Sequence, residues 1–298
     1  MSVTVRAAAK INLHLGVGAP RDDGFHPLCT VYQAISLYDD VTATADDVLG
    51  VRTTAASPRV EVVGVPDGPD HLAHRAAVAL GRHHGRDLTA ALTVDKAIPV
   101  AGGLAGGSAD AAAALVALDR LHDLRTTDDD LLRLAADLGS DVPFSLLGGT
   151  ALGTGRGELV EPVADTGPWW WVVVPATAGL ATPGVYAHLD RLRPDADPTP
   201  TPADAVLAAL TTGEPAALAR ALHNDLEAAA VDLRPELGAL LDRGVAEGAL
   251  RGLVSGSGPT VLFLAESAEH ARAVAGALEG ALVAHGPVAG AHVVVDRA

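Results

Sequence analysis

Alternating apolar and polar positions near the start of the chain predict extended structure. Residues 3–17, VTVRAAAKINLHLGV, alternate loosely, which is typical of a pair of strands or of one strand with a bend. The next segment, DDGFHPL at 22–28, contains the aspartates, glycine and proline of a turn. Four later apolar segments also predict strands, at residues 37–46, 59–66, 87–100 and 169–175.

Helical patterns occupy much of the remaining chain. Residues 127–139, TDDDLLRLAADLG, predict a helix with Thr127 as its N-cap, aspartates in its first turn and Gly139 at its end. The glycine-rich segment 139–158 predicts a loop followed by short strands. Further helices are predicted over residues 70–85, 108–122, 203–212, 215–230, 234–247 and 267–284.

The order of these elements indicates the fold class. The proline-rich segment 193–205 predicts a surface loop, and residues 252–266 predict two strands joined by a glycine turn. A last strand is predicted at 291–296. Strands and helices that mix without strict alternation are typical of the α+β class. We expect two units, residues 1–158 and 159–298.

Composition narrows the classes of function. With 298 residues, of which 49% are hydrophobic and 19% charged, the chain can bury a sizeable core. Its formal net charge is −16 and no basic stripe is visible, so a nucleic-acid partner is not expected. A small anion remains a suitable ligand, because clustered backbone N–H groups bind negative charge even in an acidic protein.

Targeting signals are also missing from the sequence. The single cysteine, Cys29, excludes an internal disulfide and suits a reducing compartment. The first residues are too polar for a signal peptide, and the apolar run 169–174 is too short to span a bilayer. We therefore expect a cytoplasmic protein without a membrane partner. The sequence carries no signal for an oligomeric state.

Three of the scarcest residue types stand side by side at KIN, residues 10–12. Only two of the 21 basic side chains are lysines, Lys10 and Lys96, and asparagine occurs only at Asn12 and Asn224. Lysine and arginine are not interchangeable, so a lysine in this arginine-rich chain indicates that a compact ammonium is needed. The alternative is an ordinary surface lysine.

Four glycines, Gly102, Gly103, Gly106 and Gly107, stand directly before an alanine-rich helix. The segment matches neither the dinucleotide pattern nor the Walker A motif, because Ser108 occupies the place of the Walker lysine. A helix beginning at Ser108 would aim its unpaired N–H groups at one point, and glycine lets an anion approach the backbone. An anion-binding loop, with Ser108 as a cap or a phosphate contact, is favoured over a glycine-rich packing turn.

Two shorter segments each allow two interpretations. In GSDVPF, residues 139–144, Asp141 follows a helix end and precedes Pro143 by two residues. It is either an N-cap or a carboxylate available for chemistry. SGSGPT, residues 255–260, lies between two apolar runs and is either a tight turn or part of a site.

These segments, taken in order, resemble the characteristic segments of a known family, the GHMP kinases. These small-molecule kinases are named for galactose, homoserine, mevalonate and phosphomevalonate, and the resemblance covers residues 5–260. It implies a ribosomal-protein-S5-domain-2-like N-terminal domain, a ferredoxin-like C-terminal domain, and an active site in the cleft between them. Residues 1–158 would be the ATP-binding domain and 159–298 the C-terminal domain.

The resemblance also implies roles for individual residues. Asp141 would be the catalytic base and Lys10 its partner, while Asn12 would hold the substrate hydroxyl or orient Asp141. ATP would bind through its phosphates to one continuous loop. The residues of that loop are Pro99, Val100, Ala101, Gly102, Gly103, Leu104, Ala105, Gly106, Gly107, Ser108 and Ala109.

KIN together with GFHPL and SDVPF is most similar to the family member that phosphorylates the 2-hydroxyl of a cytidyl-diphosphate-linked methylerythritol in isoprenoid synthesis. Phe25 and His26 would then bind the cytosine ring, and Tyr186 would form a second aromatic wall. Phe25 stands where the family usually has tyrosine, which preserves the stacking face and removes the hydroxyl. Ala105 and Ala109 replace a common glycine and a common serine, and the phosphate cradle should tolerate both.

The implied cofactors are ATP and Mg²⁺. Ser108 is a candidate Mg²⁺ ligand, and such an ion is often held mainly by phosphates and water. Two alternatives remain: a family member acting on homoserine or a mevalonate derivative, and a non-catalytic sensor of ATP and a metabolite. The first gives no reason for Phe25 and His26, and the second gives none for Lys10 and Asp141.

Overall fold

The computed structural model describes residues 1–57, 60–66, 68–100, 102–176 and 179–297. The larger of its two sheets has the strand order β12–β1–β2–β4–β3, with β5 beside β2, β6 beside β5, and β8 beside β1. Its strands are β1 (Ser2–Val17), β2 (Leu28–Thr44), β3 (Gly50–Ala55), β4 (Ala91–Lys96), β5 (Thr150–Thr154), β6 (Leu159–Pro162), β8 (His223–Asn224) and β12 (His292–Arg297).

The smaller sheet is antiparallel in the order β11–β7–β10–β9. Its strands are β7 (Trp169–Val174), β9 (Arg251–Val254), β10 (Val261–Ala265) and β11 (Leu282–Gly286). In chain order, β7 is followed by helices, then by β9 and β10, a helix and β11. This is the βαββαβ sequence of a ferredoxin-like unit, so the structure has the two-part α+β architecture expected from the sequence.

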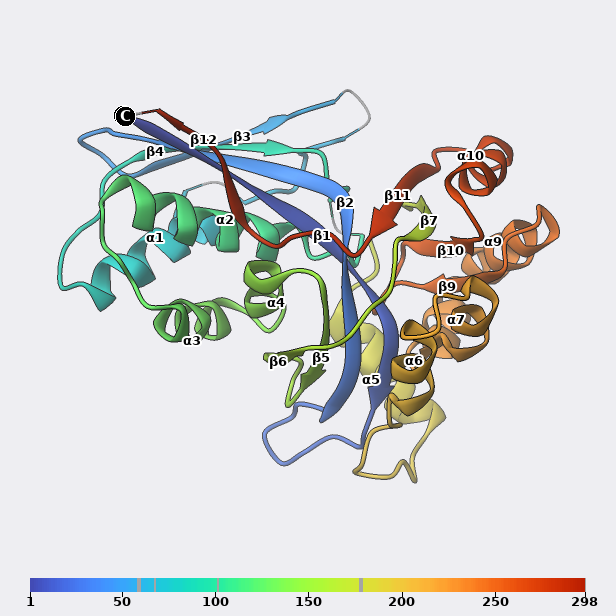
Figure 1. The fold of residues 1–298 in the computed structure, drawn as a ribbon. Helices are drawn as coiled ribbons and strands as arrows, with labels where there is room; N and C mark the ends of the chain where they lie inside the picture. The colour runs from blue at the N-terminus through green and yellow to red at the C-terminus, as the bar shows by residue number, and fades with distance from the viewer. Residues whose placement is uncertain (58–59, 67, 101, 177–178, 298) are drawn as a thin grey trace.

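Helices cover the two sheets separately, with α1–α4 on one side of the long strands β1 and β2 and with α9 and α10 beside the smaller sheet (Figure 1). Within the described ranges, no helix is long and apolar enough to cross a bilayer. A 3₁₀ turn, η1, covers Gly68–Asp70. The α-helices are α1 (Leu72–His83), α2 (Gly106–Leu121), α3 (Asp128–Leu138), α4 (Val142–Leu147), α5 (Thr182–Leu192), α6 (Asp204–Leu210), α7 (Pro215–Ala221), α8 (Glu227–Leu233), α9 (Pro235–Ala246) and α10 (Ala268–Ala277).

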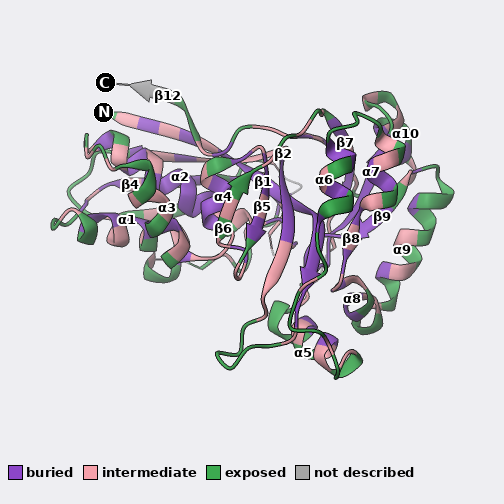
Figure 2. Cartoon of the chain, turned by 60° about the horizontal axis from the view of Figure 1, so that its bottom comes forward, coloured by how far each residue is buried: buried purple, intermediate pink, exposed green. Residues whose placement is uncertain are grey.

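Strand β1 joins the two halves of the molecule. It is a single strand, and its register with β2 shifts between Ala8 and Ala9 and again between Asn12 and His14. Its first residues alternate between buried and half-buried, whereas every residue from Ala7 onward is buried. Both faces of its second half are therefore covered, which explains why the alternation in the sequence is loose there. Figure 2 shows this buried centre along β1 and β2.

Local sequence signals correctly placed several helices. The helix predicted over 127–139 is confirmed as α3, where Thr127 Oγ1 accepts a hydrogen bond from the N–H of Asp130 at 3.2 Å. Gly139 follows its last residue. The predicted helix over 70–85 corresponds to α1. Capping side chains and stop residues act within a few residues, so the sequence carries their information directly.

The strand predicted over 59–66 is wrong. Residues 60–66 belong to no strand, and the strand of this region is β3, which pairs in parallel with β4. Val63 is 85% exposed, and Gly64 has a φ of +87° in a turn. An apolar run does not reveal whether a neighbouring strand is available to pair with it.

Three helix or loop boundaries also differ from the predictions. The loop predicted at 139–158 contains α4, which starts with Pro143 in its first turn. The helix predicted over 215–230 is divided into α7 and α8, because β8 pairs with β1 between them. The helix predicted over 267–284 is shorter than expected, because α10 ends at Ala277. Gly280, with a φ of +70°, then turns the chain into β11. At two of these places, β8 and β11, pairing with a distant strand overrides helical propensity.

The strands do not segregate at residue 158. β6, β8 and β12 all lie after it in sequence and all belong to the larger sheet. β12 pairs with β1 from Ser2 to Arg6, so the C-terminal end of the chain completes the N-terminal sheet. The proposed units 1–158 and 159–298 stay a prediction.

Close packing between α9 and β10 gives a prediction of stability. A Cβ at Gly244 would lie 2.1 Å from Cε1 of Phe263, a fully buried ring. Gly244→Ala should therefore lower the free energy of unfolding by about 1–3 kcal/mol through overpacking. Urea denaturation would measure this change.

The control for this prediction is Gly276→Ala in α10, where a Cβ would meet nothing within 4 Å. Alanine should stabilise this helix by about 0.5–1 kcal/mol relative to glycine. Equal effects of the two substitutions would contradict the packing argument.

Candidate active site

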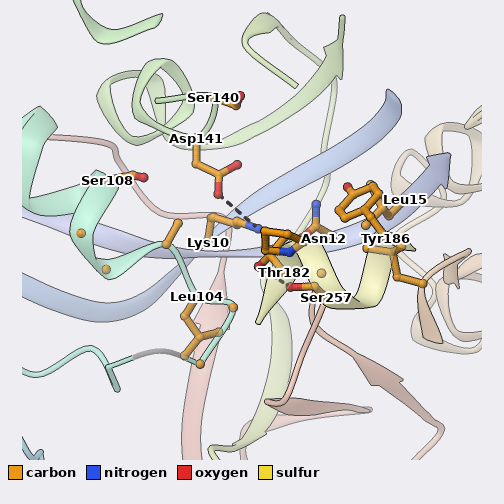
Figure 3. Close-up of a pocket in the computed structure, with 18 of the residues that line it drawn as sticks. Lys10, Asn12, Leu15, Leu104, Ser108, Ser140, Asp141, Thr182, Tyr186 and Ser257 are labelled. Carbon is orange, nitrogen blue, oxygen red and sulfur yellow. Dashed lines mark hydrogen bonds and ion pairs between the residues drawn. The ribbon is translucent and has the colours of Figure 1, made fainter. Parts of the chain in front are cut away.

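Lys10 and Asn12 lie on the same side of β1, between the two shifts in its register with β2. Lys10 Nζ donates a hydrogen bond to Asn12 Oδ1 at 2.8 Å and lies 3.7 Å from Asp141 Oδ2 (Figure 3). Asn12 Nδ2 donates to Thr30 Oγ1 at 2.8 Å. The Lys10 side chain is only 8% exposed, so it is not an ordinary surface lysine.

Asp141 immediately precedes α4, and its carboxylate makes no capping hydrogen bond to that helix. The side chain is 31% exposed and points toward Lys10 (Figure 3). Of the two interpretations left open by the sequence, the structure therefore favours the available carboxylate over the N-cap.

Tyr32 of β2 completes this group, although it belongs to none of the motifs in the sequence. It lies opposite Asn12 in the register of β1 and β2, and its ring centre is 5.5 Å from Lys10 Nζ. Burial raises the pKa of the Tyr32 phenol well above its ordinary value, and the charge of Asp141 raises it further. Tyr32 therefore stays neutral beside the carboxylate.

The segment that contains Gly102, Gly103, Gly106 and Gly107 is here called the glycine segment. It leads into α2, which begins at Gly106, two residues before the predicted start. Ser108 is consequently inside the first turn and does not cap the helix. Ala105 occupies the N-cap position with a φ of +56° and provides no side-chain hydrogen bond. The first N–H groups of α2 are thus left without a capping side chain, as an anion-binding helix end requires.

The glycine segment is also attached to its surroundings on both sides. A Cβ at Gly103, whose φ is +74°, would lie 2.6 Å from the carbonyl oxygen of Ser255. The N–H of Lys10 donates to the carbonyl oxygen of Leu104 at 3.1 Å. The SGSGPT turn is therefore a packing partner of the glycine segment, and its Ser257 Oγ makes a 2.8 Å hydrogen bond with Thr182 Oγ1.

A cavity of about 800 Å³ connects these groups, within the usual size of a small-molecule site. Ser108 and Asp141 lie on one side of Lys10, and Tyr186 lies on the other (Figure 3). Ala109 is fully buried in the core instead of lining the cavity, and Ala101 lies outside the described residues. The other predicted site residues all line the cavity: Lys10, Asn12, Phe25, His26, Pro99, Val100, Gly102, Gly103, Leu104, Ala105, Gly106, Gly107, Ser108, Asp141 and Tyr186.

Comparison with known proteins gives matches along the whole chain. Residues 71–149 match the model of the GHMP kinases N terminal domain, and residues 206–284 match that of the GHMP kinases C terminal domain. A 4-diphosphocytidyl-2-C-methyl-D-erythritol kinase from Nocardioides sp. (strain ATCC BAA-499 / JS614) is 63% identical, over 97% of this chain and 99% of the relative. The chain belongs to the GHMP kinase family. It is an ATP-dependent small-molecule kinase of the α+β, two-domain GHMP architecture.

Other comparisons place it more closely within the family. The Thermobifida fusca (strain YX) protein of the same name is 53% identical, over 98% of each chain. A crystal structure of 4-(cytidine 5'-diphospho)-2C-methyl-D-erythritol kinase has a TM-score of 0.76 at 34% identity and covers 96% of this chain and 98% of its own. A homoserine kinase from Cytophaga hutchinsonii has a TM-score of 0.74 at 18% identity, which shows the shared fold alone.

Three aromatic rings of this GHMP kinase, Phe25, His26 and Tyr186, line the cavity away from Ser108. The rings of His26 and Tyr186 have centroids 4.9 Å apart, and His26 Nε2 lies 2.8 Å from Asp190 Oδ1. Phe25 is 50% exposed, and the Arg156 guanidinium lies 4.9 Å from its ring centre. Burial raises the pKa of Tyr186, so its phenol remains neutral. Phe25, His26 and Tyr186 line the same cavity, and the part of it next to them is here called the aromatic slot.

Several residues that line the cavity of this kinase were missed by the sequence analysis. Tyr32, Arg156 and Asp190 stand in no motif, and only the fold brings them to the cavity. Lys96 also lines it. Its scarcity was a usable signal, because it is the only lysine besides Lys10.

Proposed function

We propose that this kinase transfers the γ-phosphoryl group of ATP to the 2-hydroxyl of 4-diphosphocytidyl-2-C-methyl-D-erythritol, a step of the non-mevalonate isoprenoid pathway. The observation that carries the proposal is the Lys10–Asp141 pair, whose atoms lie 3.7 Å apart between the glycine segment and the aromatic slot. The relatives at 63% and 53% identity are named for the same acceptor, which supports it.

In the proposed reaction, Asp141 is the general base. It takes the proton of the 2-hydroxyl while the hydroxyl oxygen forms a bond to the γ-phosphorus and the bond to the ADP oxygen breaks. A tertiary alcohol is a weak nucleophile, and a positioned base typically contributes about 10²- to 10⁴-fold. Asp141 makes no cap hydrogen bond to α4, so its carboxylate faces the cavity beside Lys10 and the Tyr32 phenol, where it can take this proton.

Lys10 supports this step by its charge. Its ammonium is held by Asn12 Oδ1 at 2.8 Å, so it stays beside Asp141 and offsets negative charge as the phosphoryl group moves. Asn12 is in turn fixed by Thr30. Such positioning supplies most of the acceleration in phosphoryl transfer.

The phosphates of ATP fit the first turn of α2. Gly106 and Gly107 present backbone without side chains there, and no side chain caps the helix. The α2 dipole and its free N–H groups favour negative charge at that end. We assign residues 99–108, which include the first turn of α2, to the binding of ATP, with Ala109 behind them as a packing residue.

Mg²⁺ is proposed to enter with the nucleotide, where it neutralises phosphate charge. Among the described residues there is no group of three or more His, Cys, Asp or Glu side chains that could hold a metal ion. The side chains with oxygen atoms on this side of the cavity are Ser108, Ser140 and Asp141. Such a small donor set suits an ion carried mainly by phosphates and water.

The aromatic slot is proposed to hold the cytosine ring. Phe25, His26 and Tyr186 offer flat faces for a base, and each lines the same cavity as Asp141. Cytidine monophosphate and cytidine diphosphate should therefore compete with the acceptor substrate but not with ATP. Initial-rate kinetics would measure this competition, and competition against ATP alone would contradict the assignment of the slot.

The direct test is release of ADP over a panel of acceptors. We expect turnover with 4-diphosphocytidyl-2-C-methyl-D-erythritol and none above background with mevalonate or homoserine. Turnover with homoserine or mevalonate would favour the other branches of the family. Binding of ATP and the cytidyl compound without ADP release would favour a sensor. A cytoplasmic location, suggested by the single cysteine, is part of the same proposal.

A further inference from the structure

A buried ionic cluster lies beneath the glycine segment, outside the roles assigned above. Lys96 Nζ donates hydrogen bonds to Asp39 Oδ2 at 2.5 Å and to Asp110 Oδ2 at 2.8 Å. All three residues are at most 2% exposed. They come from three elements, because Asp39 lies on β2, Lys96 ends β4 and Asp110 lies on α2.

The cluster is firmly attached to the larger sheet. Asp39 Oδ1 accepts hydrogen bonds from the N–H groups of Ala97 and Ile98, at 2.7 and 2.9 Å. These residues begin the segment that leads from β4 into the glycines. One carboxylate therefore fixes both the lysine and the backbone directly after it.

The same ammonium also touches the start of α2. A Cβ at Gly106 would lie 3.1 Å from Lys96 Nζ and 3.2 Å from Cγ2 of Ile98. Asp110 follows Gly106 by four residues and therefore lies on the same face of the helix, one turn later. Lys96 thus holds the first turn of α2 at both of its ends, by packing at Gly106 and by a hydrogen bond at Asp110.

This arrangement carries a large desolvation cost for a contact with a purely structural role. Asp110 Oδ1 is buried and has no hydrogen-bond partner among the described residues. Burial raises the pKa of Asp110 to about 8, although Lys96 acts against it. Burial alone would lower the pKa of Lys96, but the two carboxylates outweigh it and raise that pKa. Apolar residues of similar size often stabilise a core at least as well as a buried ionic cluster.

We propose that Asp39, Lys96 and Asp110 form a positioning cluster that fixes the first turn of α2 and thereby sets the affinity of the glycine segment for the phosphates of ATP. The cluster acts through geometry, because the carboxyl groups of Asp39 and Asp110 face one ammonium and leave no net positive charge for the site. This inference rests on the proposed binding of ATP by the glycine segment, and it is independent of which acceptor is used.

The test removes the link to α2 and leaves the link to the sheet. Asp110→Ala keeps the Lys96–Asp39 pair and removes a buried carboxylate, so the chain should still fold. We expect affinity for a non-hydrolysable ATP analogue, measured by calorimetry, to fall about tenfold or more, since small misplacements of a binding group have effects of this size. In steady-state kinetics KM for ATP should rise, while kcat and KM for the acceptor change less than about threefold.

Two further variants separate positioning from stability. Asp110→Asn keeps an oxygen that can accept from Lys96 and should restore ATP affinity to within about threefold of the wild type. Leu118→Ala removes a fully buried side chain from the later part of α2 and should lower thermal stability without changing ATP affinity. Unchanged ATP affinity in Asp110→Ala, or an equal loss in Leu118→Ala, would overturn the proposal.

The calorimetric readout also separates this proposal from the proposed function. It needs no acceptor, so an enzyme that proves inactive on the cytidyl compound still reports on the cluster. If Asp110→Ala weakens ATP while the acceptor panel shows another substrate, the cluster stands and the proposed acceptor fails. Footprinting of the glycine segment with the bound analogue shows whether Gly106 lies in the ATP site. If the wild type binds the analogue but Gly106 is not protected, the cluster proposal fails.

Discussion

Asp141→Asn should lower kcat by about 10²- to 10⁴-fold, because the amide cannot take the proton of the acceptor hydroxyl. The substitution preserves size and shape, and Lys10 at 3.7 Å can still approach the remaining oxygen. KM for ATP should therefore stay close to the wild-type value. Single-turnover measurements at saturating ATP and acceptor would isolate the chemical step.

The matched control for this substitution is Asp137→Asn, an exposed aspartate on α3 that does not line the active-site cavity. It makes the same chemical change elsewhere and should leave kcat unchanged. Near-normal turnover in Asp141→Asn would show that another group removes the proton, and the mechanism proposed above would have to be abandoned.

Gly103→Ala should raise KM for ATP by about tenfold or more, since displaced binding groups commonly have effects of this size. A Cβ there would lie 2.6 Å from the carbonyl oxygen of Ser255, and the φ of +74° disfavours any side chain. Because the contact is with backbone, the glycine segment has to move away from the 255–260 turn. Its N–H groups would then no longer point to one place.

The control for this second prediction is Gly85→Ala, in the loop after α1. Gly85 has a similar φ of +63°, but a Cβ there would meet nothing within 4 Å. Its substitution tests backbone strain without the collision and should leave KM for ATP unchanged. If both variants bind ATP like the wild type, the position of the glycine segment does not control nucleotide binding.

Much of the site could be predicted from the sequence, because its parts are local. KIN places Lys10 and Asn12 two residues apart on one strand, and GSDVPF contains Asp141, although the short helix α4 that follows it was not predicted. The four glycines and the helix after them are consecutive. Residue type and spacing are enough to predict a glycine turn before a helix, whereas the roles of Lys10, Asn12 and Asp141 followed from the resemblance to the GHMP kinases.

Tyr32 and the Asp39–Lys96–Asp110 cluster could not be predicted in this way. Lys96 and Asp39 are 57 positions apart, and their contact depends on the pairing of β2 with β4. The same limit explains the errors in the predicted elements. The apolar run at 59–66 has no strand to pair with, whereas the helical run at 215–230 is interrupted by a strand that does.

The sequence by itself determined the α+β class and the glycine segment with its helix, and its resemblance to the GHMP kinases singled out Lys10 and Asp141 as candidate active-site residues. Only the tertiary structure decided that Asp141 leaves its helix uncapped, that β12 returns to the N-terminal sheet, and that a buried ammonium lies beneath α2. The physical reason is that propensity and capping act between neighbours along the chain. Pairing and burial, in contrast, depend on segments that meet only after the whole chain has folded.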